Sequence, residues 1–200
     1  MNNAQDNNEY CSTTQAAKML GISVGTVQQL VENGKLQAWK TSGGHRRILL
    51  HSVNTLLNDP NSSPKPSSPR VVDGLHIYVV EDDPILLKGY QKLLEKTALP
   101  MHVSLFDNGL DAMLSIGAAF PDLLILDLEV PFIDGFEMLT RLQKIVAKKP
   151  KHILVITGLS ETEIQAKKHV LDSVTLLKKP VNPAFIEGYL RALYMTSQPL

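Results

Sequence analysis

The 200-residue sequence contains a single cysteine, Cys11, and no long hydrophobic run. One cysteine cannot form an internal disulfide, so the sequence does not indicate an oxidising compartment. No apolar stretch approaches the ~20 residues that a membrane span requires. The first ten residues, MNNAQDNNEY, lack the basic and apolar regions of a signal peptide. We therefore expect a cytoplasmic protein with no membrane partner.

The sequence also lacks a net charge, because 20 basic and 20 acidic side chains cancel. Their distribution is nevertheless uneven. Residues 1–58 carry five basic and three acidic side chains, whereas residues 74–200 carry thirteen basic and fifteen acidic ones. The first region is suited to meeting a polyanion, and the second concentrates carboxylates.

Proline marks the boundary between these regions. Four of the 12 prolines fall in NDPNSSPKPSSPRVVD, residues 58–73, among serines and asparagines. This composition favours an extended linker over a packed segment. We predict a disordered N-terminus over 1–9, a small domain over 10–58, a flexible linker over 59–73 and a second domain over 74–197.

Two short helical patterns open the small domain. The first ends at Gly21, and the second runs from a predicted cap at Ser23 to Gly34. The strand-like runs LQAWK and RRILL then flank TSGGH and predict a β-hairpin. The segment HSVNTLL predicts one more helix, with Ser52 as its cap.

The hairpin tip, TSGGHRRI at residues 41–48, combines small and cationic side chains. Gly43 and Gly44 allow the backbone to approach a ligand closely, and Arg46 and Arg47 offer planar donors suited to phosphate. A polyanion is therefore a candidate partner. A solvated hairpin tip remains the alternative at this point.

Residues 10–58, with STTQAAKMLGISVGTVQQL and GKLQAWKTSGGHRRI, resemble the MerR/excisionase-type winged helix-turn-helix DNA-binding domain. The resemblance implies that the helix over 24–32 lies in the major groove and that the hairpin follows the backbone. Thr26 and Gln28 are expected on the exposed side of that helix. The implied DNA contacts are Thr26, Gln28, Gln29, Gly43, Gly44, His45, Arg46 and Arg47. Many relatives carry arginine near position 28, so this domain would make fewer phosphate contacts.

After residue 74 the pattern alternates between strands and helices. Five such βα units predict a doubly wound five-stranded parallel sheet, whose site lies beyond the carboxyl ends of the strands. These ends carry EDD at 81–83, DLE at 127–129, TG at 157–158 and KKP at 178–180. Carboxylates gathered at one edge repel one another unless a cation joins them, and such oxygen ligands suit Mg²⁺.

The stretch 74–197 resembles the receiver domain of two-component response regulators, through VVEDDP, LLILDLEVPFIDG, VITG and LLKKP. The resemblance implies that Asp127 accepts a phosphoryl group, and that Glu81, Asp82, Asp127 and the main-chain carbonyl of Glu129 hold Mg²⁺. It also implies a switch hydroxyl on Thr157 and a catalytic ammonium on Lys179. Asp83 remains a rival for the acid pair, because the EDD triplet can be shifted by one residue.

One position departs from this family. Most receivers carry an aromatic residue three positions before the lysine of the Lys-Pro pair, where this chain has Leu176. The usual coupling of hydroxyl movement to burial of a ring is therefore expected to be absent or altered.

The combined expectation is a transcription regulator that a sensor histidine kinase or phosphotransfer protein phosphorylates, and that forms a homodimer on activation. It would not be an enzyme beyond its own phosphorylation and dephosphorylation. One alternative is a receiver adaptor whose first domain binds protein. Another is a haloacid-dehalogenase-like phosphatase, which the residues after Asp127 fit poorly, since they are Leu-Glu-Val-Pro and not the DxDxT pattern.

Overall fold

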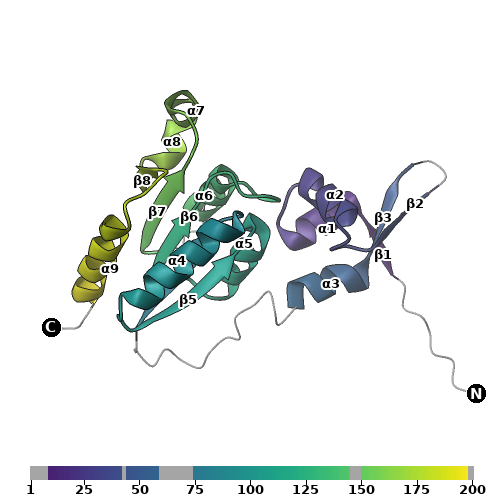
Figure 1. The fold of residues 1–200 in the computed structure, drawn as a ribbon. Coiled ribbons are helices and arrows are strands. Elements are labelled where there is room, and N and C mark those ends of the chain that lie inside the picture. The colour runs from purple at the N-terminus through teal and green to yellow at the C-terminus, as the bar shows by residue number, and fades with distance from the viewer. Residues whose placement is uncertain (1–8, 42–43, 59–73, 145–149, 198–200) are drawn as a thin grey trace, which may run out of the picture. The chain divides into compact units, whose positions relative to one another are not determined.

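The computed structural model describes residues 9–41, 44–58, 74–144 and 150–197 (Figure 1). The chain forms two compact units, residues 1–63 and 64–200, called here the N-terminal and the C-terminal unit.

The N-terminal unit combines three helices with a small antiparallel sheet (Figure 1). Its described elements are β1 (Tyr10–Ser12), α1 (Thr13–Leu20), α2 (Val24–Glu32), β2 (Ala38–Lys40), β3 (Arg46–Leu49) and α3 (Leu50–Asn58). The strand order is β1-β3-β2. The predicted helices and hairpin are confirmed. Strand β1 was not predicted, because three residues carry no periodicity and only pairing with β3 makes them a strand.

Local capping explains where the first two helices begin and end. Ser12 and Gln15 form a capping box at α1, in which the Ser12 hydroxyl accepts from the backbone N–H of Gln15 at 3.1 Å and the side-chain Oε1 of Gln15 accepts from the Ser12 N–H at 2.8 Å. Gly21 ends α1 with a φ of +66°, in the left-handed region that glycine tolerates best. Ser23 caps α2 as predicted.

The prediction that Ser52 caps the third helix is wrong. Helix α3 begins two residues earlier, at Leu50, whose N–H donates to the carbonyl of Glu9 at 2.8 Å. The buried Ser52 hydroxyl donates to the carbonyl of Leu49 at 2.7 Å and accepts from the N–H of Gln37 at 3.1 Å. It therefore joins α3 to the segment before β2.

The C-terminal unit is a five-stranded parallel sheet with helices packed on its faces (Figure 1). Its strands are β4 (Leu75–Val80), β5 (Met101–Phe106), β6 (Leu123–Leu126), β7 (His152–Thr157) and β8 (Thr175–Lys178). Its described helices are α4 (Pro84–Lys96), α5 (Gly109–Ala118), α6 (Gly135–Lys144), α7 (Glu161–Ala166), α8 (Lys168–Leu171) and α9 (Pro183–Ser197). The order β5-β4-β6-β7-β8 confirms the predicted doubly wound fold.

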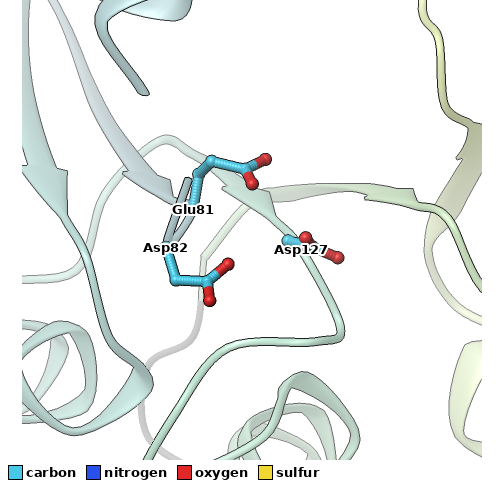
Figure 2. Close-up of side chains that lie close together, drawn as sticks. All are labelled: Glu81, Asp82 and Asp127. Carbon is cyan, nitrogen blue, oxygen red and sulfur yellow. The ribbon is translucent and has the colours of Figure 1, made fainter. Parts of the chain in front are cut away.

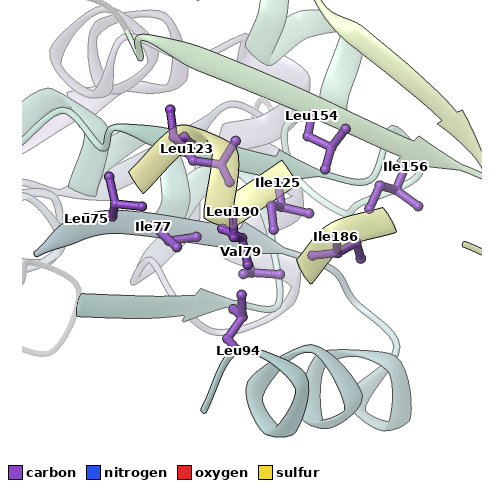
Figure 3. Close-up of a cluster of buried hydrophobic side chains, with 11 residues drawn as sticks. Leu75, Ile77, Val79, Leu94, Leu123, Ile125, Leu154, Ile156, Ile186 and Leu190 are labelled. Atoms are coloured by element: carbon purple, nitrogen blue, oxygen red, sulfur yellow. The ribbon is translucent and has the colours of Figure 1, made fainter. Parts of the chain in front are cut away.

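One buried cluster joins the sheet to helices α4 and α9 (Figure 3). Alternate residues of β4, β6 and β7 point to this face, and one residue of α4 and three of α9 cover them. The members are Leu75, Ile77, Val79, Leu94, Leu123, Ile125, Leu154, Ile156, Ile186, Leu190 and Leu193. This packing holds the strands in place relative to the helices and therefore fixes the position of the residues that follow the strands.

The segment over 161–171 forms two short helices, α7 and α8, in place of one continuous helix. Lys167 leaves the helical region, with φ −124° and ψ 24°, and separates α7 from α8. The Lys167 ammonium lies 4.3 Å from the centre of the Phe136 ring, and this cation–π contact joins the break between α7 and α8 to helix α6.

Candidate functional site

Three carboxylates converge at the carboxyl edge of the parallel sheet. Val80 and Leu126 are paired in register at the ends of β4 and β6, so the residues that follow them are neighbours. Figure 2 shows Glu81 and Asp82 after β4 and Asp127 after β6, with their side chains gathered together. One carboxylate oxygen from each lies within 4.8 Å of the others. The sheet thus brings together residues that are 45 positions apart in the chain.

Among the described residues, one ammonium meets this cluster. Lys179 follows β8, and its backbone N–H donates to the carbonyl of Thr157 at 2.9 Å, which holds it at the edge of β7. Its Nζ donates to Asp127 Oδ2 at 2.6 Å and to Glu81 Oε1 at 2.9 Å. The long sequence separation of these partners shows that the topology of the sheet assembles the site.

Burial sets the electrostatics of the cluster, because Glu81 is 2 % exposed and Asp127 is 4 % exposed. Burial raises the pKa of Glu81 above its usual value, despite the opposing hydrogen bond and charge of Lys179. Burial alone would lower the pKa of Lys179, but its hydrogen bonds to Asp127 and Glu81 outweigh burial and raise it. One ammonium among three carboxylates leaves negative charge uncompensated.

This acidic site is typical of an Mg²⁺ site, because three carboxylates offer the hard oxygen ligands that Mg²⁺ prefers. The structure also separates the two rivals in the EDD triplet. Asp82 joins the cluster, whereas Asp83 caps α4 by accepting from the N–H groups of Ile85 and Leu86 at 2.7 and 3.2 Å. Asp83 is therefore occupied at the helix start.

The other residues at the strand ends lie around this cluster. Thr157 is fully buried, and its hydroxyl accepts from the N–H of Leu159 at 3.2 Å. Glu129 is exposed, and its N–H donates to Asp127 Oδ1 at 3.1 Å. Leu176, in the position where receivers usually carry an aromatic residue, is half-buried on β8.

Two residues of this site were missed from the sequence. Tyr90 on α4 has its pKa raised to about 12 by burial, with the charge of Glu81 adding to the effect. Gly135 opens α6, and an added Cβ there would lie 2.7 Å from the Cα of Leu128 and 2.8 Å from the carbonyl of Asp127. The position of Gly135 at the end of the motif LLILDLEVPFIDG was a signal that could have identified it. Tyr90 carried no such signal, because only the fold brings α4 beside the cluster.

In the N-terminal unit, helix α2 presents Gln28 and Gln29 to solvent. The expectation that Thr26 is exposed is wrong, since this residue is 3 % exposed. Its hydroxyl shares a 2.8 Å hydrogen bond with the hydroxyl of Ser23, and its N–H donates to the same oxygen at 3.0 Å. Thr26 therefore belongs to the start of α2 and cannot read a base edge from there.

The hairpin tip places its cations on different sides. Gly44 has a φ of +79°, and Gly43 lies outside the described residues. Arg46 turns toward α2 and forms an ion pair with Glu32 at 2.8 Å. Arg47 is exposed and stands opposite Trp39 in the register of β2 and β3. Because neighbouring residues of a strand point to opposite faces, Arg46 and Arg47 cannot contact the same phosphate in this conformation.

A polar hollow of ≈ 260 Å³ lies between α1, α2 and the hairpin. Its lining includes Gln28, His45, Arg46 and also Lys40, which the sequence analysis did not select. Lys40 pairs with Arg46 across the hairpin. The predicted hairpin was therefore a signal that could have identified Lys40. Lys40 and Arg46 give the wall of this hollow the positive charge that attracts an anion.

Across the part of the chain that the structure describes, we find no helix with the length and apolar character needed to cross a membrane.

Comparisons with known proteins support both units. The profile of the response regulator receiver domain matches residues 77–191, and that of a helix-turn-helix domain matches residues 10–59. The chain is 32% identical over 82 residues to the positive transcription regulator of virulence factors BvgA from Bordetella pertussis, covering 41% of this chain and 38% of that protein. It is 29% identical over 106 residues to protein-glutamate methylesterase/protein-glutamine glutaminase 3 from Rhodospirillum rubrum, covering 52% of this chain and 28% of that protein.

The chain thus spans less than half the length of both relatives, and these relatives include a transcription regulator and an enzyme. Among solved structures, the receiver domain of a sensor histidine kinase from Pseudomonas aeruginosa shares the fold, with a TM-score of 0.53 at 21% identity over 62% of this chain and 99% of that one. That receiver domain has a magnesium ion coordinated in its active site cleft. With its parallel sheet, its acidic edge and the matching profile, the chain belongs to the response regulator receiver family and carries a helix-turn-helix domain before the receiver.

Proposed function

We propose that the chain is a phosphorylation-controlled DNA-binding response regulator, with Asp127 as its phosphoacceptor. The observation that carries this proposal is the 2.6 Å contact between Lys179 Nζ and Asp127 Oδ2 inside a cluster of three carboxylates. An ionised carboxylate needs no general base in order to attack phosphorus. Because Asp127 would retain the product, the receiver would not turn over a separate substrate.

In the proposed step, an Asp127 oxygen attacks the phosphorus of a phosphohistidine or a small acyl phosphate in line. A new O–P bond forms, and the bond from phosphorus to the donor nitrogen or oxygen breaks with its electron pair leaving on the donor. Lys179 would transfer its hydrogen bond from Asp127 to the phosphoryl oxygens, where negative charge develops. The Thr157 hydroxyl would then turn toward the same oxygens.

The residues fit Mg²⁺ as the metal of this site. The carboxylates of Glu81, Asp82 and Asp127 and the main-chain carbonyl of Glu129 would hold it. When bound, it would supply the positive charge that one lysine cannot provide against three carboxylates and an incoming phosphoryl group. The residual negative charge of the cluster supports this assignment.

The N-terminal unit would bind DNA through α2 and the hairpin. Gln28 and Gln29 would face base edges, where glutamine can pair with adenine. Gly44, His45, Arg46 and Arg47, with Gly43 beside them in sequence, would contact the backbone. Two such units joined through phosphorylated receivers would gain affinity through effective concentration, so we infer a homodimer on activation. A sensor histidine kinase or phosphotransfer protein would be the donor.

The phosphoryl step is tested by intact-mass measurement after incubation with acetyl phosphate and Mg²⁺. The wild-type protein should gain one phosphoryl group, and Asp127→Asn should gain none. The exposed Asp172 provides a matched control, because Asp172→Asn makes the same change away from the cluster and should label like the wild type. Equal labelling of Asp127→Asn would overturn the assignment of the acceptor.

The output is tested by enrichment of genomic fragments on the purified protein, with and without acetyl phosphate and Mg²⁺. We expect a reproducible set of fragments whose recovery increases with phosphorylation in the wild type but not in Asp127→Asn. Recovery of no specific fragment in either state would favour an adaptor whose N-terminal unit binds protein.

A further inference from the structure

An apolar pocket lies beside the acidic site, with Lys179 in its wall. It measures ≈ 520 Å³ and lies between α4 and the segment that joins β8 to α9. Leu86 and Leu93 form the α4 wall, and Val181 and Ile186 form the opposite one. Both helices rest on the same buried cluster (Figure 3), which keeps the two walls in place. We call this hollow the α4–α9 pocket.

The size and lining of the pocket suit a small organic ligand. Pockets that bind such ligands measure roughly 300–1,000 Å³ and are mostly apolar with a few polar groups. Two exposed apolar side chains are neighbours of lining residues in the sequence, because Ile85 is 80 % exposed and Phe185 is 43 % exposed. These residues adjoin the lining residues Leu86 and Ile186.

Gly89 supplies a second, independent observation. It lies within α4 and lines the pocket, and a Cβ added there would meet no atom within 4 Å. A glycine inside a helix is destabilising relative to alanine. No steric crowding requires this cost at Gly89. What the missing side chain does provide is open space in the wall of the pocket.

The polar part of the wall restricts the charge of the ligand. Tyr90 and Lys179 line the pocket, and both carry hydrogen-bond donors. Lys179 is already bonded to Glu81 and Asp127, and these carboxylates lie behind it. Because Lys179 is already paired, an anionic ligand would leave water without this cation free to balance its charge. A neutral carbonyl or ether oxygen would accept a hydrogen bond without that cost.

We propose that the α4–α9 pocket binds a neutral, largely apolar small molecule, and that this ligand modulates the receiver. The coupling would run through Lys179, which belongs both to the pocket wall and to the acidic cluster. A ligand that fixes Lys179 in its present position would oppose its transfer to a phosphoryl group. The coupling rests on the proposed phosphorylation of Asp127, whereas the binding does not.

The binding is tested with a pair of fluorescent probes on the full chain. N-phenyl-1-naphthylamine is neutral, and 1-anilinonaphthalene-8-sulfonate has nearly the same body with a negative charge. We expect saturable binding of one neutral probe per chain, and binding of the sulfonate weaker by about tenfold or more, which corresponds to about 1.4 kcal/mol. Equal affinities, or no saturation, would overturn the proposal.

Variants locate the probe. Gly89→Leu, whose Cβ would meet no atom within 4 Å, should fill the pocket and weaken binding of the neutral probe by about tenfold or more. Gly188→Leu is the matched control, because Gly188 also lies within a helix with no atom within 4 Å of an added Cβ, but does not line the pocket. Equal loss in both variants, or in neither, would reject the site. Leu86→Glu, at a residue 40 % exposed, tests the same wall if Gly89→Leu folds poorly.

Two further outcomes are decided by the same samples. If sedimentation shows a wild-type dimer that Gly89→Leu converts to a monomer, the pocket is a contact between two copies and the proposal falls.

If phosphorylation proceeds, the neutral probe should slow it in the wild type but not in Gly89→Leu, and phosphorylation should weaken probe binding by reciprocity. Unchanged rates would remove the coupling. Absence of labelling altogether would instead overturn the proposed function and leave the binding result standing.

Discussion

The two units of this protein hold their polar and charged functional residues in opposite ways. In the receiver, Glu81 and Asp127 are nearly inaccessible and meet Lys179 at the ends of buried strands. In the N-terminal unit, the glutamines of α2 and Arg47 stand in solvent, and Arg46 is bound to Glu32. Buried like charges are costly unless a cation balances them, whereas exposed cations cost little. The acidic cluster, with Glu81 and Asp127 buried, therefore points to its ligand more strongly than the exposed residues point to theirs.

The largest expected effect comes from a glycine at the packed edge of the receiver, compared with a glycine on the exposed helix of the N-terminal unit. Gly135→Ala would push its Cβ into Leu128 and the carbonyl of Asp127, so we expect a loss of about 1–3 kcal/mol in the free energy of unfolding of the receiver. Mg²⁺ binding should weaken as well, because the Asp127 loop must shift. Urea unfolding with and without Mg²⁺ measures both effects.

Gly25→Ala on α2 is the control in the N-terminal unit. An added Cβ there would lie 3.6 Å from the Ser23 hydroxyl, an ordinary contact, so this variant should be more stable by about 0.5–1 kcal/mol. Similar behaviour of the two variants would show that the receiver edge is no more tightly packed than the exposed helix.

The second prediction separates two neighbouring carboxylates of the receiver. Asp82→Ala should remove most of the stabilisation by Mg²⁺, which reaches about 2.7 kcal/mol when the ion is at 100 times its Kd. Its stability without Mg²⁺ should not fall, because the change removes a like charge from the cluster. Asp83→Ala should do the reverse, with a loss of about 1 kcal/mol from the cap of α4 and normal Mg²⁺ binding.

Thermal unfolding across an Mg²⁺ titration, with calorimetry of Mg²⁺ binding, distinguishes these variants. Stronger loss of Mg²⁺ affinity in Asp83→Ala than in Asp82→Ala would mean that the acid pair is shifted by one residue.

The third prediction concerns the exposed cations. If both arginines contact phosphates, Arg46→Ala and Arg47→Ala should each reduce the slope of log affinity against log salt by ~1 and weaken binding to all DNA sequences. Glu32→Gln should strengthen DNA binding, because Arg46 no longer leaves an ion pair in order to bind phosphate. An exposed pair contributes about 0.2–1 kcal/mol, so the gain should be at most about fivefold.

Binding isotherms over a salt series, on a specific and a scrambled duplex, measure these slopes. Gln28→Ala serves as the control, because loss of a base contact should reduce discrimination between the duplexes and leave the slope unchanged. An unchanged slope in the Arg46/Arg47 double variant would identify the hairpin tip as a solvated loop.

The smallest expected effect tests burial inside the N-terminal unit. Cys11 is 5 % exposed, and burial raises the pKa of its thiol. As pH rises, the unfolded chain ionises first while the folded chain keeps its proton, so stability falls above the ordinary thiol pKa. Cys11→Ala should remove this decline. Alkylation by iodoacetamide at alkaline pH should be slower in the folded than in the urea-unfolded protein, and equal rates would contradict the burial of Cys11.

Most of the fold could be predicted from short patterns. The alternation of apolar strands and amphipathic helices predicted the parallel sheet, and the strand ends identified Glu81, Asp127 and Lys179 before their contacts were known. This succeeds because periodicity is a local property, and because parallel topology brings every carboxyl end to one edge.

Short elements and adjacent residues were harder to assign. Strand β1 has no pattern of its own, and the burial of Thr26 depends on where the first turn of α2 faces. Neighbouring residues have the same local composition and differ only in the direction of their side chains. A pattern that is correct to within one residue therefore leaves such pairs undecided.

By itself, the sequence determined the two units, the order of their elements and the set of strand-end residues, because these depend on the hydrophobic pattern of contiguous segments. Only the tertiary structure decided that Asp82 joins the acidic cluster while Asp83 caps α4, that Arg46 pairs with Glu32, and that α4 and α9 enclose a pocket beside Lys179. Each of these depends on the direction of a side chain or on atoms distant in the chain, and packing of the whole unit sets both.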